Sequence, residues 1–119
     1  MLAGDFKQEI MKLHNAVNIS IFGQGLRWQK VEFFQDKIII IAHNKRVPAL
    51  NSLDETDRFT TRMMDLALLM QFKNMFKQEL ENFLSFEPLA VLKDYDPKSE
   101  MSMCAVLLDR SVEELLPSI

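Results

Sequence analysis

Apolar residues recur at helical spacing at the start of the chain and give way to strand-like stretches after it. This change marks the end of the first predicted element. From Phe6 to Ile21 the apolar residues recur every three or four positions, which predicts a helix. Asp5 and Gln8 have the spacing of a capping box at its start, and Gly23 is a typical stop signal. The chain therefore opens with an amphipathic helix that ends at the glycine.

Two strands are predicted next, over residues 26–34 and 37–42, with Gln35 and Asp36 as the tight turn between them. Four consecutive isoleucines, residues 38–41, show no alternation with polar residues. Such a run is typical of a strand that is covered on both faces. We therefore expect the second strand to lie in the centre of the sheet.

A long helix and a second hairpin complete the pattern. Ser52 and Glu55 have capping-box spacing and predict a helix that runs to about residue 83. Residues 89–93 and 101–108 have the composition of two further strands. The order helix, strand, strand thus occurs twice.

The fold class that follows is α+β, in a single domain over residues 1–119. Its predicted order is α-β-β-α-β-β, and a capping box at Ser111 and Glu114 adds a short helical tail at about residues 111–116. The first and third strands carry more polar residues than the other two. We therefore expect a mainly antiparallel, four-stranded sheet of order 1-2-4-3, with both long helices on one face in a two-layer arrangement.

The predicted long helix carries two apolar stripes on roughly opposite sides. One stripe consists of Phe59, Met63, Leu66 and Met70, and the other of Met64, Leu68, Phe72 and Met75. A helix on a sheet needs only one stripe, so another surface must cover the second. Three coverings remain open for the second stripe: the first helix, a second copy of the chain in a homodimer, or a ligand or partner peptide.

Composition and charge exclude several function classes. The chain has 14 basic and 17 acidic residues, a formal net charge of -3, which gives no general attraction to nucleic acid. Residues 63–72 form the most hydrophobic stretch, about half the ~20 residues that a membrane span needs. The first residues have no signal-peptide pattern. We expect a soluble cytoplasmic protein with no direct membrane insertion.

Few residues have the type and spacing that indicate catalysis or metal binding. His14 and His43 have no second ligand at helical spacing, and Cys104 lies in an apolar strand, so no metal site and no nucleophile is expected. Asp94 and Asp96 could supply oxygen ligands, but their turn lacks the glycine and the ligand number of a calcium loop. We expect them to bond their own backbone. No catalytic residue and no cofactor is predicted.

A group of basic residues is the one candidate for anion binding. Lys45 and Arg46 fall in one loop, and Arg58 and Arg62 lie on one face near the start of the long helix. Together they could hold bicarbonate, phosphate or an acidic partner surface. The alternative is a solvated basic face.

The order of several short motifs resembles the MpsC-like family of small soluble bacterial proteins, over about residues 5–109. The motifs occupy residues 21–25, 36–41, 46–50, 92–97 and 103–108. The chain departs from the family at Leu26, where many members have proline, and near Phe86, where a glycine is usual.

The resemblance implies an association with a cation-translocating, membrane-potential-generating system that supports inorganic-carbon uptake. It brings no catalytic residues. We therefore expect a non-enzymatic accessory or regulatory protein that forms a homodimer and docks on a membrane transport complex through protein contacts. The alternative is a small-ligand or anion-binding regulatory module, and an enzyme that uses Asp94 or Asp96 is a third hypothesis.

Overall fold

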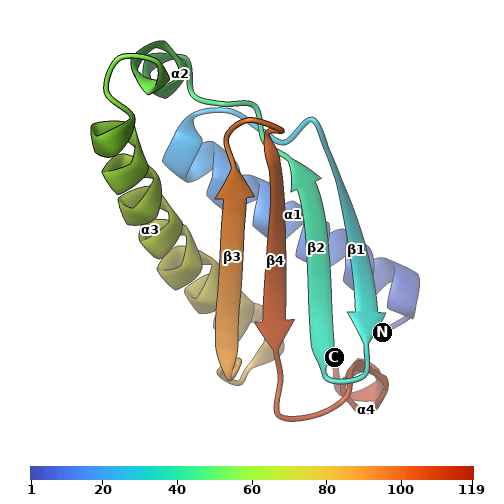
Figure 1. Ribbon diagram of the computed structural model, residues 1–119. Coiled ribbons are helices and arrows are strands. Elements are labelled where there is room, and N and C mark those ends of the chain that lie inside the picture. The colour runs from blue at the N-terminus through green and yellow to red at the C-terminus, as the bar shows by residue number, and fades with distance from the viewer.

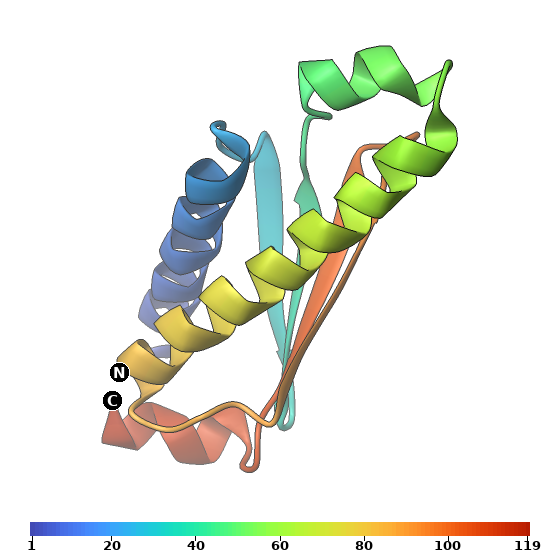
Figure 2. The same cartoon turned by 90° about the vertical axis from the view of Figure 1, so that its left-hand side faces the viewer.

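The computed structural model describes residues 1–119 and consists of two layers. A four-stranded antiparallel sheet forms one layer, and both long helices lie on the same face of it (Figures 1 and 2). The predicted strand order, β1-β2-β4-β3, is confirmed. The elements are α1 (Ala3–Phe22), β1 (Trp28–Phe34), β2 (Lys37–His43), α2 (Pro48–Asp54), α3 (Arg58–Leu84), β3 (Ala90–Asp96), β4 (Met101–Leu107) and α4 (Val112–Leu115), followed by a 3₁₀ turn (Leu116–Ser118).

Helix α1 begins before the predicted capping box. Its N-cap is Leu2, which makes no side-chain cap bond, and Asp5 lies within the first turn. The Asp5 carboxylate still interacts favourably with the positive, N-terminal end of the helix dipole. The predicted stop is confirmed, because Gly23 adopts a left-handed φ of 74° and donates its N–H to the Ile19 carbonyl.

The predicted long helix is two helices. Pro48 occupies the first turn of α2, so Ser52 falls inside that helix and caps nothing. Asp57 caps α3 instead, since its side chain accepts a hydrogen bond from the Thr60 N–H. Helix α3 then runs to Leu84, close to the predicted end.

The core lies between the helices and the inner face of the sheet. Among the buried side chains are Phe6, Ile10, Ile38, Ile40, Phe72, Phe76, Leu80 and Val106. Along β2 buried and half-buried residues alternate, because the helices cover only one face. The expected central position of β2 is confirmed, but the expected cover on both faces is wrong for the single chain, since Ile39 and Ile41 lie half-buried on the open face of the sheet.

The tail forms as the sequence predicts. Ser111 accepts a hydrogen bond from the Glu114 N–H, 3.2 Å away, and α4 follows it. At the opposite end of the molecule α3 diverges from α1 and extends past it (Figure 2). This projection accounts for the elongated shape, 51 × 23 × 22 Å.

Candidate functional site

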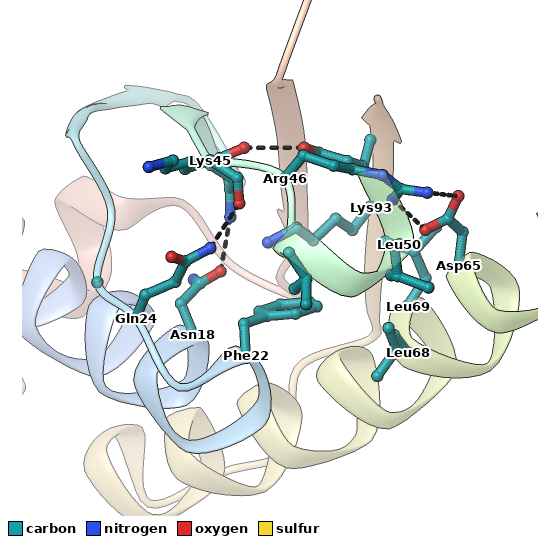
Figure 3. A pocket seen from close by; sticks show the side chains of 14 residues that line it. Asn18, Phe22, Gln24, Lys45, Arg46, Leu50, Asp65, Leu68, Leu69 and Lys93 are labelled. Atoms are coloured by element: carbon teal, nitrogen blue, oxygen red, sulfur yellow. Dashed lines mark hydrogen bonds and ion pairs between the residues drawn. The ribbon is translucent and has the colours of Figure 1, made fainter. Parts of the chain in front are cut away.

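A pocket lies in the opening between the diverging helices (Figure 3). Its walls come from the end of α1, the loop between β2 and α2, the middle of α3 and the inner face of β3. Most of this wall is apolar, through Phe22, Leu50, Leu68 and Leu69. The cavity volume of the pocket is about 40 Å³, and its total empty space, open solvent included, is about 530 Å³. A cavity of this volume suits a few water molecules or one small acid group.

Lys93 brings a positive charge to this apolar pocket. Strand alternation turns Val91, Lys93 and Tyr95 toward the helices, so the lysine side chain runs from β3 into the space beside Phe22 (Figure 3). It forms no salt bridge. Burial lowers the pKa of Lys93 to about 8, so most of the ammonium groups remain charged at neutral pH.

His14, which belongs to α1, contacts Lys93. Its ring is fully buried, with Phe72 and Phe76 each edge-on at 5.3 Å between ring centroids. Gln29 donates its amide N–H to the Met11 carbonyl, which leaves its oxygen to accept from His14 Nδ1 at 3.1 Å. His14 Nε2 is then an acceptor, and it lies 3.4 Å from Lys93 Nζ.

The face of an aromatic ring completes the lysine's surroundings. Lys93 Nζ lies 3.4 Å from the centroid of the Phe72 ring, a favourable cation–π position. Burial, followed by the nearby charge of Lys93, lowers the pKa of His14 to about 3. The pair at the base of the pocket is therefore a neutral imidazole and a single ammonium.

Hydrogen bonds hold a polar wall beside the lysine in place. Asn44 donates to Asn18 Oδ1 at 2.7 Å and accepts from the Ser102 hydroxyl at 2.6 Å. Tyr95 donates its hydroxyl proton to the Asn44 carbonyl at 2.8 Å. Burial raises the pKa of Tyr95 to about 12, so it stays a neutral donor. These bonds fix the wall and leave Lys93 as the largely buried cation with free donors.

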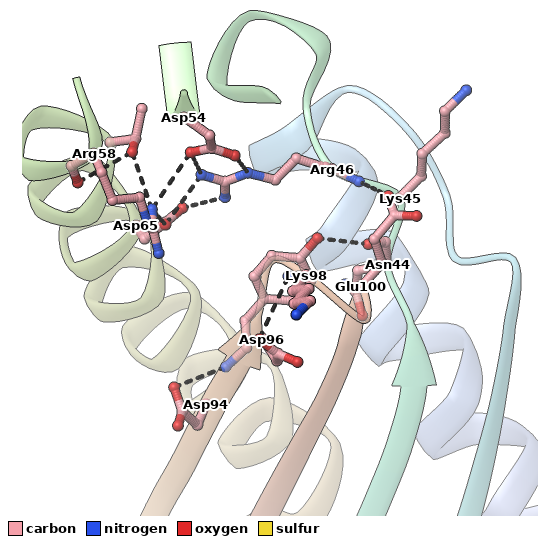
Figure 4. A network of polar contacts seen from close by, with 12 residues as sticks. Asn44, Lys45, Arg46, Asp54, Arg58, Asp65, Asp94, Asp96, Lys98 and Glu100 are labelled. Atoms are coloured by element: carbon pink, nitrogen blue, oxygen red, sulfur yellow. Dashed lines mark hydrogen bonds and ion pairs between the residues drawn. The ribbon is translucent and has the colours of Figure 1, made fainter. Parts of the chain in front are cut away.

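Arg46, one of the predicted anion-binding residues, is buried and paired with two carboxylates (Figure 4). Its guanidinium donates two hydrogen bonds to Asp54, at 2.9 and 3.1 Å, and two more to Asp65. Burial acts to lower the pKa of Arg46, but the two carboxylates outweigh it and raise that pKa. An external anion at Arg46 would have to displace a carboxylate.

The four predicted basic residues do not form one free cluster. Arg58 joins Arg46, since its Nη1 lies 3.4 Å from both Asp54 and Asp65. Lys45 and Arg62 are exposed and form no salt bridge. The structure thus brings two of the four together in an ion-pair network and leaves two apart in solvent.

Of the three coverings left open for the stripe that contains Phe72, the first helix is the one that the structure shows at that residue. Phe72 is fully buried beneath α1, so it is a core residue and not an interface residue. Of the same stripe, Leu68 and Met75 are half-buried and Met64 is exposed. The other stripe lies on the side away from the core, with Phe59 77%, Met63 52%, Leu66 50% and Met70 62% exposed.

The outer face of the sheet is the second uncovered apolar surface. Outward-facing side chains come from all four strands: Trp28, Phe34, Ile39, Ile41, Leu92 and Met103. Leu92 and Met103 are each 53% exposed, and Phe34 is 63% exposed. No helix of this chain lies on that face (Figure 1).

The remaining candidates have ordinary structural surroundings. Burial raises the pKa of Cys104 to about 12, so its thiol is not ionised at neutral pH. Asp94 and Asp96 accept backbone N–H bonds from Tyr95 and Ser99, as the sequence predicts. His43 Nε2 lies 3.9 Å from a Glu100 carboxylate oxygen.

Neither a metal cluster nor a membrane-spanning helix is found. No group of three or more His, Cys, Asp or Glu side chains is placed to hold a metal ion. None of the helices has both the length and the apolar character needed to cross a bilayer. Comparison with family models, curated proteins and solved structures finds no match for this chain. The MpsC-like resemblance therefore stays an expectation that rests on its motifs.

Sequence reasoning missed the pair of Lys93 and His14. The signal that could have found Lys93 is strand parity, because Lys93 stands two residues from the apolar Val91 and two from Tyr95. A lysine on the inner face of a strand needs a partner or a cavity. The helical spacing likewise placed His14 beside the core-facing Leu13, without indicating its partner.

The buried neutral His14 makes stability depend on pH. In the unfolded chain His14 is protonated below pH 6.5, its ordinary pKa. In the folded chain the pKa of His14 is about 3, so the ring stays neutral down to about that pH. Stability is therefore lost as the pH falls through this window. Between pH 6.5 and 4.5 we expect a loss of about 2 to 3 kcal/mol, measured by urea unfolding.

A His14→Gln variant provides the control for this effect. Glutamine keeps a hydrogen-bonding group but does not titrate, so its stability should vary much less over the same pH range. If the free energy of unfolding changes with pH equally in the variant and the wild type, groups other than His14 cause the acid sensitivity.

Proposed function

We propose that the protein is a non-enzymatic accessory or regulatory protein that works as a homodimer through the open face of its sheet. The observation that carries the proposal is the apolar row on that face. Ile39 and Ile41 lie at its centre, on a strand whose sequence is typical of cover on both sides. A second copy of the chain would provide the missing layer.

The composition of the face fits an interface. Its centre is uncharged and apolar, and charged residues stand at its edges, as in protein interfaces with an apolar core and a polar rim. Two such sheets pack face to face at about 10 Å. This arrangement buries Leu92 and Met103, which the single chain leaves half in solvent.

Charge favours one symmetry for the pair. Lys30, Ile41, Met103 and Asp94 occupy one row across the four strands. A two-fold axis parallel to the strands sets the β1 edge of one copy over the β3 edge of the other. Lys30, which forms a 3.1 Å salt bridge to Glu32 of its own chain, then also faces Asp94 of the second copy, and the reciprocal contact forms at the opposite edge.

The proposed role comes from the MpsC-like resemblance. We propose that the dimer docks, through protein contacts, on a cation-translocating system linked to inorganic-carbon uptake. The chain's contribution would be binding and regulation.

Molar mass in solution tests the dimer. Light scattering after size exclusion should give about twice 13.9 kDa for the wild type and 13.9 kDa for Ile41→Asp. The aspartate places a charge at the centre of the apolar face, where pairing would desolvate it. Met70→Asp on the exposed face of α3 is the matched control and should stay dimeric.

Charge reversal tests the symmetry. Lys30→Asp and Asp94→Lys should each weaken the dimer about tenfold, and the double variant should recover the affinity. A wild type that stays monomeric at 0.5 mM, or a dimer that Met70→Asp disrupts and Ile41→Asp does not, contradicts the proposed interface.

A small-ligand-binding regulatory module is the second candidate function. The pocket over Lys93 favours it, since it combines apolar walls with a largely buried ammonium that has free donors. This candidate rests on the inner face of the sheet, and the dimer rests on the outer face.

A further inference from the structure

We propose that the pocket between α1 and α3 binds a small organic monocarboxylate, with its acid group on the Lys93 ammonium and its short apolar tail along the leucines of α2 and α3. This inference deepens the ligand-binding candidate and does not depend on the dimer. It names both the ligand class and the residue that selects it.

Lys93 is the largely buried cation of the pocket whose donors are free, whereas Lys45, the other lysine of the lining, is exposed. An ammonium has three N–H groups, and His14 Nε2 can accept only one of them. The neighbouring polar side chains, Asn18, Asn44 and Tyr95, already bond one another. An incoming acceptor therefore meets the ammonium before any other group.

Lys93 has no countercharge within the chain. A largely buried ammonium normally has an acidic partner, because desolvation without one is unfavourable. The groups that face Lys93 are His14 on α1, Phe72 on α3 and Cys104 on β4, and all three are uncharged. The other charged group near Cys104 is Lys73 on α3, which is a second cation and no countercharge. Asp65 also lines the pocket, but Arg46 holds its carboxylate. A bound carboxylate supplies the charge that the chain lacks.

The size and polarity of the pocket favour a small monoacid. Its cavity volume of about 40 Å³ accepts one acid group, and Leu50, Leu68 and Leu69 line the same pocket. A polyanion or a nucleotide would place further charges against these leucines without partners. A chain of a few carbon atoms would instead bury them.

Protonation of Lys93 sets the pH range for binding. Only the ammonium attracts the acid, and burial lowers the pKa of Lys93 to about 8. Affinity should therefore be constant near neutral pH and fall about tenfold per pH unit well above pH 8. Arg46 stays charged throughout this range, and the pKa values of Cys104 and Tyr95, each about 12, lie far above it, so these groups do not share the transition.

Calorimetric titration with sodium acetate, butyrate, hexanoate and octanoate tests the proposal, with butylamine and inorganic phosphate as chemical controls. We expect millimolar or tighter binding that strengthens from acetate to butyrate, and no binding of butylamine or phosphate. Lys93→Met keeps the length of the side chain and removes the charge. It should fold at least as stably as the wild type and bind butyrate at least tenfold more weakly.

Lys45→Met provides the matched control, because Lys45 is an exposed lysine at the same pocket. Its affinity for butyrate should equal that of the wild type. The proposal is overturned if no acid of the series binds at 10 mM, if Lys93→Met binds butyrate as tightly as the wild type, or if phosphate binds equally well. The same titration on Ile41→Asp, the variant expected to be monomeric, shows whether ligand binding is independent of dimer formation.

Discussion

Replacing Phe72 with alanine should destabilise the protein by about 3 to 5 kcal/mol. The Phe72 ring is fully buried and packs against His14 and Phe76, so truncation leaves a cavity between α1 and α3. It also removes the aromatic face beneath the Lys93 ammonium. Urea unfolding at pH 7, followed by circular dichroism, measures the change in the free energy of unfolding.

Phe59→Ala is the matched control on the same helix. Phe59 is 77% exposed, so the same chemical change should shift stability by less than about 0.5 kcal/mol. Similar losses at the two positions would contradict the assignment of the Phe72 stripe, and not the Phe59 stripe, to the core.

Arg46→Ala should have the second large effect, a loss of about 3 to 5 kcal/mol. The substitution leaves the carboxylates of Asp54 and Asp65 next to each other with only the exposed Arg58 between them. The pKa of Asp54, which the hydrogen bond from Arg46 now lowers, should then rise. Thermal unfolding at two salt concentrations measures the loss.

Two further variants show whether the network acts as a unit. Arg62→Ala removes a solvent-exposed arginine from the same region and should cost less than about 0.5 kcal/mol. Replacing Arg46, Asp54 and Asp65 together by leucine or methionine should recover much of the stability, since no buried charge is left unpaired. An Arg46→Ala variant as stable as Arg62→Ala would contradict this interpretation.

The topology could be predicted because local signals and the sheet pattern agree. The polar character of β1 and β3 identified them as edge strands, and the glycine at residue 23 marked the end of α1. The capping box at Ser111 is real, whereas the identical pattern at Ser52 is not. Pro48 begins a helix earlier, which places Ser52 inside it, and a capping pattern carries no information about a helix that already started.

The candidate site could not be predicted, because its contacts depend on helix rotation and on distant pairs. The two stripes of α3 have equal apolar character, so periodicity could not tell which one faces the sheet. His14 and Lys93 meet across 79 positions of sequence, and neither has a local partner that marks it. Arg46 was identified as a binding residue from its charge alone, although Asp54 and Asp65 neutralise it.

The pairing of β2 with β4 has a consequence for how the chain is made. Each hairpin joins neighbouring segments, but the central pair joins strands that are far apart in sequence. During synthesis on the ribosome the isoleucine strand therefore emerges with one edge and two apolar faces uncovered, and it keeps that edge until β4 arrives. The rate of translation through the second half of the chain thus sets how long the most aggregation-prone segment is exposed.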